Sequence, residues 1–378
     1  MSNSSLHHIV PTGPSNSSSP APLMLHPSFR RAWLIWLIVT LLTCFFGTLT
    51  NIVLFIVTLT YRKIRDSSSS PLIMHCTALD LYISAVVAPV TAILGYLGPS
   101  QYLPPQFCRF FGLGFYNLYN IHVWAGCILA FQRLIAAWRP LQYERLTTKQ
   151  ALTCMIVLPW LLGCLINTFP VFEIGTKVIP ASFAGGCFYV SAGHSTSLLH
   201  GFSMYLPSTL MGIFYILIFC QTILASRRRA SSQIHANMAV TLKRRLEITR
   251  MLFVSFIWFC VSMYPLTLVI AFFPQQYNTN IALHLIPRYL TASYSCLNPL
   301  FCFASSKLYM AGVRHLFSHS CRCGQVAPLF SISGGRDAAG RNSNCNSGPG
   351  TTGRVLTSSR RPSENQEQNK AKPCEPIS

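Results

Sequence analysis

The chain has 378 residues, of which 51% are hydrophobic and only 10% are charged. Soluble domains carry about 25% charged residues, so this composition is too apolar for a water-soluble surface and indicates a membrane protein. The formal net charge is +20. Because the basic residues gather in alternate predicted connections, this charge reflects membrane topology, and nucleic-acid binding is a poor explanation for it.

Seven apolar stretches are long enough, at about 20 residues or more, to cross roughly 30 Å of hydrocarbon as helices. They lie near 33–60, 71–96, 107–137, 151–172, 197–225, 247–273 and 282–304. The third contains ionisable residues, and the fifth and seventh begin with polar residues, yet all are predicted to span. The expected fold is an all-α membrane protein with a seven-transmembrane helix bundle over 32–304.

Residues 1–31 are rich in Ser and Pro and contain no apolar core, so we expect no cleavable signal peptide. The first span is then expected to direct insertion into the membrane. Asn3 and Asn16 each begin an Asn-Ser-Ser glycosylation sequon, which favours an extracellular N-terminal segment.

The distribution of Lys and Arg predicts the orientation, because cytoplasmic connections hold the excess. With the N-terminus outside, the connections 61–70, 138–150 and 226–250 and the tail from 305 are cytoplasmic, and they hold 23 of the 29 basic residues. We therefore predict a multi-pass protein of the plasma membrane. Membrane lipid is an expected partner, since basic residues attract anionic lipid at the inner surface.

After the seventh span, residues 305–320 alternate apolar and basic side chains at near-helical spacing, which predicts an amphipathic helix on the membrane surface. Cys321 and Cys323 follow and are candidate acylation sites. A zinc site that includes His319 is the weaker alternative, because it lacks a fourth ligand at suitable spacing. Residues 321–378 are predicted to be a disordered cytoplasmic tail.

Most of the 15 cysteines lie inside spans, where they are expected to pack as small apolar residues. Cys108, at the outer start of the third span, and Cys187, in the long outer connection 174–196, instead face an oxidising compartment. We expect them to form a disulfide that ties this connection to the third helix.

Amide and ionisable side chains inside a span are costly in hydrocarbon and usually mark function. In this chain they are Asn51, Asp80, His122, Arg133 and Asn298. Each alone could merely bond a neighbouring helix. Their spacing from other residues favours a functional set.

These residues and their surroundings resemble the rhodopsin-like (class A) G-protein-coupled receptors over about 33–320. The matching marks are Asn51 in TNIVLF, Asp80 and Pro89 in ALDLYISAVVAP, Cys108 lying 25 residues before Arg133, Pro140 seven residues after it, Trp160 with Pro170, Pro207 with Tyr215, Phe259 with Pro265, and Asn298 with Pro299. The resemblance implies an extracellular ligand and a heterotrimeric G protein as partners. It also implies that Arg133 contacts the C-terminal helix of the G-protein α-subunit.

Prolines inside three spans favour a two-state switch. Pro207, Pro265 and Pro299 each remove a backbone hydrogen bond and give the helix a place to bend. Once the helices part, Arg133 can donate hydrogen bonds to an inserted partner helix. A basic rim around the expected groove comprises Arg227, Arg228, Arg229, Lys243, Arg244 and Arg245. The switch residues that the resemblance implies are Gln132, Arg133, Tyr215, Phe259, Met263, Pro265, Asn298, Pro299 and Cys302.

The residues expected to restrain Arg133 in the resting state differ from those of the family. Most members carry an acidic residue before the arginine, and this chain has Gln132. In the sixth helix, Arg245 occupies the position where the family frequently has a glutamate. Glu247 lies two residues further on and so about 200° around the helix. We therefore expect a weak resting restraint and raised basal signalling.

Two further switch positions depart from the family, since Met263 replaces a tryptophan and Cys302 replaces a tyrosine. Both belong to the moving parts of the usual switch. They favour either a rewired receptor or an atypical, scavenging receptor that binds ligand without efficient G-protein coupling.

His122 stands where the family usually places a small hydroxyl residue, beside a sodium site that includes Asp80 and Asn298. A protonated imidazole could replace the ion by pairing with Asp80, which would make the receptor proton-sensitive. The alternative is a neutral histidine bonded to a neighbouring helix. Asn51 belongs to the same expected polar core.

The family's ligand-pocket positions fall on Phe115, Tyr116, Tyr119, Leu199, His200, Ser203, Leu266, Thr267, Ile270, His284, Arg288 and Ala292. Phe115 replaces the aspartate that would bind an amine, and the seventh span has no lysine for a retinal Schiff base as in opsins. The cavity is expected to be aromatic and aliphatic with one cation, Arg288. This favours a lipid-like or carboxylate-bearing ligand, unless Arg288 meets Glu173 or lipid phosphate instead.

The runs FCRFFG and SMYP resemble the melatonin-receptor-like group and the neighbouring medium-chain fatty-acid receptor. No internal repeat indicates a transporter. Neither HExxH nor GxSxG occurs, so we expect no enzyme activity, cofactor or metal.

Overall fold

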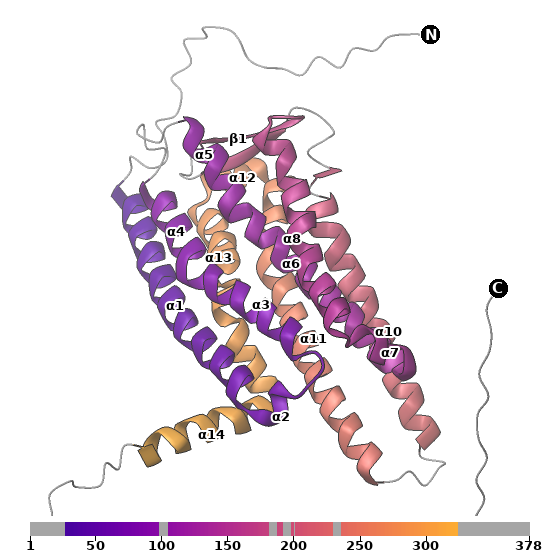
Figure 1. Ribbon diagram of the computed structural model, residues 1–378. Coiled ribbons are helices and arrows are strands. Elements are labelled where there is room, and N and C mark those ends of the chain that lie inside the picture. The colour runs from indigo at the N-terminus through magenta and orange to yellow at the C-terminus, as the bar shows by residue number, and fades with distance from the viewer. Residues whose placement is uncertain are drawn as a thin grey trace, which may run out of the picture. The chain divides into compact units, whose positions relative to one another are not determined.

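The computed structural model describes residues 27–97, 105–180, 187–191, 198–199, 201–229 and 236–323. These residues belong to one compact unit that ends at Gln325. They form long helical stretches packed side by side as a bundle (Figure 1). Asn3, Asn16 and the predicted tail beyond Cys323 lie outside the described residues.

The long stretches follow one another in the predicted order. They are α1 (Pro27–Thr60); α3 (Ser70–Tyr82), η2 (Ile83–Val87) and α4 (Ala88–Leu97); α5 (Pro105–Phe111), η3 (Gly112–Tyr116) and α6 (Asn117–Trp138); α8 (Lys149–Val171); η4 (Gly201–Tyr205) and α10 (Leu206–Arg229); α11 (Ala236–Phe272); and α13 (Ile281–Ser305). Short helices lie in the connections, namely α2 (Arg62–Arg65), α7 (Pro140–Leu146) and α12 (Pro274–Thr279), and α14 (Lys307–Cys323) follows the last stretch.

Six of the long stretches are apolar enough to cross a membrane. α13, with 25 residues, is also long enough at about 1.5 Å per residue, but it carries polar side chains along its length, among them His284, Arg288 and Asn298. The predicted seven-helix bundle is confirmed. Helices suit this environment because each satisfies its backbone hydrogen bonds internally.

The outer faces of the helices are apolar, as contact with lipid requires. On α1, for example, Ile35 is 62% exposed and Phe46 is 61% exposed. In water such faces would be unfavourable, whereas lipid chains solvate them as well as protein does.

A glycine permits a close approach of α1 and α13. A Cβ atom at Gly47 on α1 would lie 2.4 Å from the Cβ atom of Cys296 on α13, so any larger residue would force the helices apart. Small residues commonly allow such contacts between membrane helices.

Three long stretches contain a π-helical segment that the sequence did not predict. In the fifth stretch, η4 ends directly before Leu206, and Pro207 is the second residue of α10. In the second, η2 ends at Val87 and Pro89 is the second residue of α4. Pro265 and Pro299 lie inside α11 and α13 as predicted. π-turns, like prolines, interrupt the regular hydrogen-bond pattern and often mark functional places.

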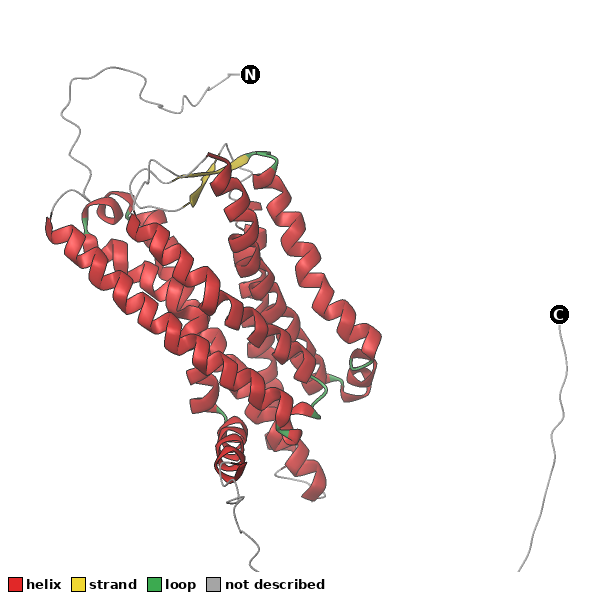
Figure 2. Ribbon diagram, turned by 60° about the vertical axis from the view of Figure 1, so that its left-hand side comes forward, coloured by secondary structure: helices red, strands yellow, loops and turns green. Residues whose placement is uncertain are grey.

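A two-stranded hairpin lies across one end of the bundle, as Figures 1 and 2 show. β1 (Thr176–Pro180) pairs antiparallel with β2 (Cys187–Ser191), with Thr176 opposite Ser191 and Pro180 opposite Cys187. The sequence did not predict this hairpin. Because β2 begins at Cys187, we refer to this end as the disulfide end.

The opposite end carries α14 and is called the α14 end below. α14 leaves α13 at an angle (Figure 1) and packs back on the bundle through Tyr309, which is fully buried. Burial raises the pKa of the Tyr309 hydroxyl above its ordinary value. The amphipathic helix was predicted over 305–320; Cys321 and Cys323 lie in the last turn of α14, where side chains are not described.

Candidate functional site

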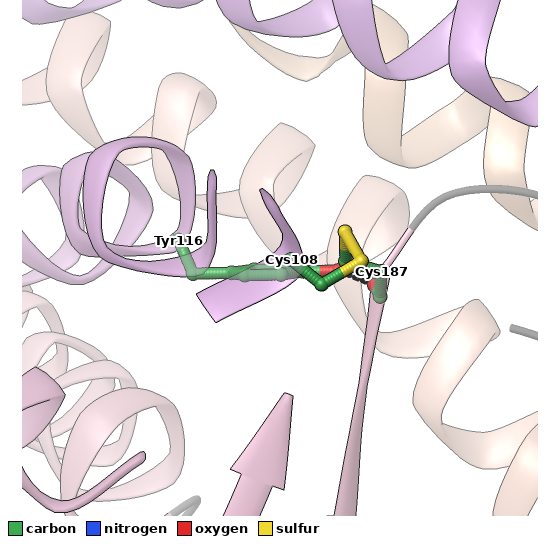
Figure 3. The surroundings of a disulfide bond; sticks show 3 residues. All are labelled: Cys108, Tyr116 and Cys187. Carbon is green, nitrogen blue, oxygen red and sulfur yellow. Dashed lines mark hydrogen bonds between the residues drawn. A yellow bond between two sulfur atoms is a disulfide. The ribbon is translucent and has the colours of Figure 1, made fainter. Parts of the chain in front are cut away.

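The disulfide end is tied together by one covalent bond. Cys108 on α5 and Cys187 on β2 form a disulfide, with their Cα atoms 5.3 Å apart. The Tyr116 hydroxyl donates a hydrogen bond to the Cys187 carbonyl oxygen at 2.5 Å, so Tyr116 holds the same strand (Figure 3). The predicted disulfide is confirmed.

A cavity of about 620 Å³ lies below this hairpin, within the size range of small-molecule sites. Ten of the predicted pocket residues line it: Phe115, Tyr116, Tyr119, Leu199, Ser203, Leu266, Thr267, Ile270, Arg288 and Ala292. His200 lies outside the described residues. His284 does not line the cavity and is buried against the Tyr277 and Trp33 rings.

Arg288 is positioned by aromatic groups from two other elements. Its Nε donates a hydrogen bond to the Tyr277 hydroxyl on α12 at 2.9 Å, and its guanidinium carbon lies 5.6 Å from the centre of the Trp33 ring on α1. A cation at this distance from an indole face is attracted to it. These contacts hold the guanidinium at the cavity wall.

A chain of polar contacts lies deeper in the bundle. Asn298 Nδ2 donates to Asp80 Oδ2 at 2.6 Å, His122 Nε2 approaches Asp80 Oδ1 to 3.0 Å, and the Tyr294 hydroxyl lies 3.3 Å from His122 Nδ1. The His122–Asp80 approach has the distance of an ion pair but lacks the alignment of a hydrogen bond. Both side chains are almost fully buried, so a charge on either is costly unless the other balances it.

This polar chain separates two cavities. A second cavity, of about 80 Å³, is lined by Asp80 and Asn298. His122, Val123, Phe259 and Tyr294 line both this cavity and the larger one. A molecule that fills the larger cavity would therefore touch His122, which contacts Asp80, and Tyr294, which contacts His122.

Asn51 does not take part in this chain of polar contacts. Its Nδ2 donates to the Ser295 carbonyl oxygen at 2.9 Å, to the Gly47 carbonyl oxygen at 3.0 Å and to Ser84 Oγ at 3.3 Å. The sequence grouped Asn51 with Asp80 in one polar core. In the structure it joins α1 to the backbone of α13.

Arg133 and Gln132 are both buried on α6 towards the α14 end, at 4% and 0% exposure. Neither amide atom of Gln132 has a hydrogen-bond partner among the described residues. A buried amide without partners carries a desolvation cost. Gln132 therefore does not take the place of a carboxylate as a polar anchor in this arrangement.

Most of the remaining switch residues are also buried, and Pro265 and Asn298 are partly buried. Tyr215, Phe259 and Met263 join one apolar cluster with Tyr294, which brings α10, α11 and α13 together. Cys302 lies 3.6 Å from Ser255 Oγ, sulfur to oxygen. Pro299 follows Asn298 on α13; Pro299 is buried and Asn298 is partly buried.

Comparison with known proteins identifies the fold family. Residues 50–301, more than half of the chain, match the family described as 7 transmembrane receptor (rhodopsin family). The chain belongs to this family. It is a G-protein-coupled receptor and a multi-pass membrane protein.

Relatives of the receptor at low identity include opsins and a rhodopsin. It is 25% identical to an ultraviolet-sensitive opsin of Melopsittacus undulatus, over 69% of its own length and 76% of the opsin. It is 24% identical to a rhodopsin of Mizuhopecten yessoensis described as GQ-coupled, over 63% of its own length and 50% of that protein. A crystal structure of squid rhodopsin shares its fold, with a TM-score of 0.65, 13% identity, and coverage of 85% of the receptor and 95% of the rhodopsin.

Some residues that shape the receptor's sites were not predicted from its sequence. Trp36 on α1 lines the large cavity. Trp258 on α11 donates to the Tyr294 carbonyl oxygen at 3.0 Å and packs on Phe301. Tryptophans on apolar helices do not reveal from sequence which neighbour they face.

The predicted basic rim lies at the ends of α10 and α11 nearest the α14 end, where side chains between 225 and 246 are not described.

Proposed function

We propose that the receptor transduces an extracellular small molecule, lipid-like or bearing a carboxylate, to a heterotrimeric G protein. The observation that carries this proposal is the cavity of about 620 Å³, which has an aromatic and aliphatic wall and Arg288 beside it. An apolar cavity with few polar groups suits an apolar ligand, and guanidinium suits a carboxylate head group. Because α13 contains no lysine, we do not propose a Schiff base to retinal.

We propose that the disulfide end faces the outside of the plasma membrane and the α14 end faces the cytoplasm. A structural disulfide persists in an oxidising compartment, which supports the first assignment. The concentration of basic residues in the connections at the α14 end supports the second. An extracellular N-terminus and glycosylation at Asn3 and Asn16 are part of the same proposal.

The proposed signal route runs through the shared wall of the two cavities. A ligand in the large cavity would contact His122 and Tyr294 and so bias the Tyr294–His122 and His122–Asp80 contacts. A ligand shifts a two-state equilibrium only by contacts that differ between the states, and these side chains can supply that difference.

We propose coupling to a G protein, in preference to ligand scavenging. The test needs no ligand: nucleotide exchange by several Gα subtypes is measured in membranes with and without the receptor. Gln132→Asp should lower the basal rate roughly tenfold, because a carboxylate beside Arg133 adds a charge-assisted restraint to the resting state. Gln132→Asn has the same shape without the charge and should leave the rate near that of the parent.

An unchanged or higher rate in Gln132→Asp would contradict the expected weak restraint. Absence of nucleotide exchange by every Gα subtype, in parent and variants that reach the cell surface, would favour scavenging. Surface expression is measured in the same cells so that loss of folding is not mistaken for loss of coupling.

The ligand class is tested at Arg288 with decanoic acid and methyl decanoate as probes. Arg288→Ala should reduce the potency of the acid roughly tenfold or more, because the carboxylate loses a charged partner. Arg288→Lys should retain part of the potency, since the charge remains while the planar fork is lost. The ester serves as the control that is insensitive to charge. Equal potency of the acid on Arg288→Ala and the parent would rule out this role for Arg288.

A further inference from the structure

α11 carries two opposite charges one helical turn apart near the α14 end. Glu247 and Arg250 are three residues apart and therefore project from the same face of the helix. Their side chains contact the short segment where α13 ends at Ser305 and α14 begins at Lys307, with Ser306 between them.

Each of the two charges bonds to a different helix end. Glu247 Oε1 accepts hydrogen bonds from the Ser306 hydroxyl at 3.2 Å and from the Leu308 backbone N–H at 2.7 Å. Arg250 Nη2 donates to the Ser305 carbonyl oxygen at 2.5 Å. The carboxylate thus caps the first turn of α14, and the guanidinium caps the last turn of α13.

The charges match the polarity of the helices that they cap. The first N–H groups and last C=O groups of a helix lack partners within the helix, so its N-terminus attracts an anion and its C-terminus attracts a cation. α13 presents its C-terminus and α14 its N-terminus at the same place. Glu247 and Arg250 supply the two complementary charges from one helix.

Apolar packing supports the same contact from the inner side. Ile248 and Met251, each one residue beyond a charged partner, are 2% and 1% exposed. They belong to one cluster with Val57 and Tyr309, which come from α1 and α14. The end of α11 is therefore seated on α14 by both polar and apolar contacts.

We propose that Glu247 and Arg250 form a junction clasp that holds α11 in its resting position against the α13–α14 junction. Movement of this part of α11 about Pro265 would break the three hydrogen bonds of the clasp together. The clasp would supply a restraint on basal activity that Gln132 does not supply. Its effect on signalling rests on the proposed G-protein coupling, whereas its effect on the position of α11 does not.

The position of α11 is tested by hydrogen–deuterium exchange on the full-length receptor purified in detergent. Glu247→Gln should speed exchange in the peptide that contains Leu308 and Tyr309 roughly tenfold, because the Leu308 amide loses a charged acceptor. Glu144→Gln removes an exposed carboxylate of α7 and is the matched control. Its exchange in this peptide should equal that of the parent.

A charge exchange separates helix capping from a simple ion pair. If the two charges acted only on one another, the double variant Glu247→Arg with Arg250→Glu would keep the slow exchange. The clasp predicts fast exchange in this variant, because a cation would then face the N-terminus of α14 and an anion the C-terminus of α13. Slow exchange in the double variant would overturn the proposal.

Basal nucleotide exchange on added G protein is measured on the same preparations. Faster deuterium exchange together with roughly three- to tenfold higher nucleotide exchange in Glu247→Gln would support the clasp and the coupling. Faster deuterium exchange, with no nucleotide exchange by the parent or any variant, would support the clasp and contradict the coupling. Unchanged deuterium exchange in Glu247→Gln would overturn the clasp, whatever the nucleotide exchange shows.

Discussion

His122 gives the buried carboxylate of Asp80 a partner that can gain or lose charge. The imidazole approaches one carboxylate oxygen, Asn298 donates to the other, and Tyr294 lies on the far side of the ring. In a buried place a carboxylate and an imidazolium balance one another, whereas either charge alone is costly. Protonation of His122 should therefore stabilise this resting arrangement.

The expected consequence is a pH-dependent response. Receptor-stimulated nucleotide exchange should differ between mildly acidic and neutral pH, because a charged imidazole would balance the buried Asp80 carboxylate and a neutral one would not. His122→Ser should remove this difference. His75→Gln, at a histidine that accepts a hydrogen bond from Trp160, is the control and should keep it. The same pH dependence in His122→Ser and the parent would exclude the mechanism.

Individual residues were predictable where the sequence carries a spacing signal. Asp80, His122 and Asn298 were expected together and lie in contact. Asn51 bonds elsewhere, and the role of Glu247 was not foreseen. A sequence gives the angle of Glu247 around α11, but the neighbour at that angle depends on where α14 turns away from α13.

At the scale of elements, the hairpin of β1 and β2 is held to the bundle by the disulfide and by Tyr116. The hairpin follows α8 and precedes the fifth stretch, so it closes a long connection. Cross-linking its second strand to α5 restricts the unfolded chain over a sequence separation of 79 residues.

Cys187→Ser should lower the free energy of unfolding by ~2–4 kcal/mol, since the cross-link no longer restricts the unfolded chain. Thermal unfolding of the purified receptor measures this loss. Cys108→Ser and the double variant should lose the same amount as Cys187→Ser, because all three remove one bond. Cys154→Ser, at a free and exposed cysteine, should change little. A clearly larger loss in the double variant would show that the two thiols act separately.

Helices were predictable as elements because hydrocarbon demands long apolar stretches, and the predicted spans agree with the helical stretches to within a few residues at most ends. The π-helical segments η2, η3 and η4 were not predicted. Such segments depend on how each helix packs, and Gly112–Tyr116 contains no proline to signal one. The hairpin was not predicted because the length of a connection does not determine whether it forms strands.

At the scale of the whole receptor, the number of spans, the disulfide and ten of the 28 residues that line the large cavity were predictable from the sequence. The depth at which the cavity ends was not predictable, because it depends on His122 and Tyr294, which come from two helices far apart in the chain. The junction clasp of Glu247 and Arg250 at the α14 end was not predictable either. Both features arise from contacts between stretches that lie far apart in the chain.

The contact of Gly47 with Cys296 has a consequence for how motion in the receptor can be measured. Since Gly47 has no side chain and α1 lies directly against Cys296 of α13 there, the two helices cannot come closer together at this depth. We therefore expect rearrangements to take place in other parts of the bundle. Probes on α1 and α13 beside this contact should report one constant distance with and without ligand, and so provide the internal reference against which a displacement of α11 is judged.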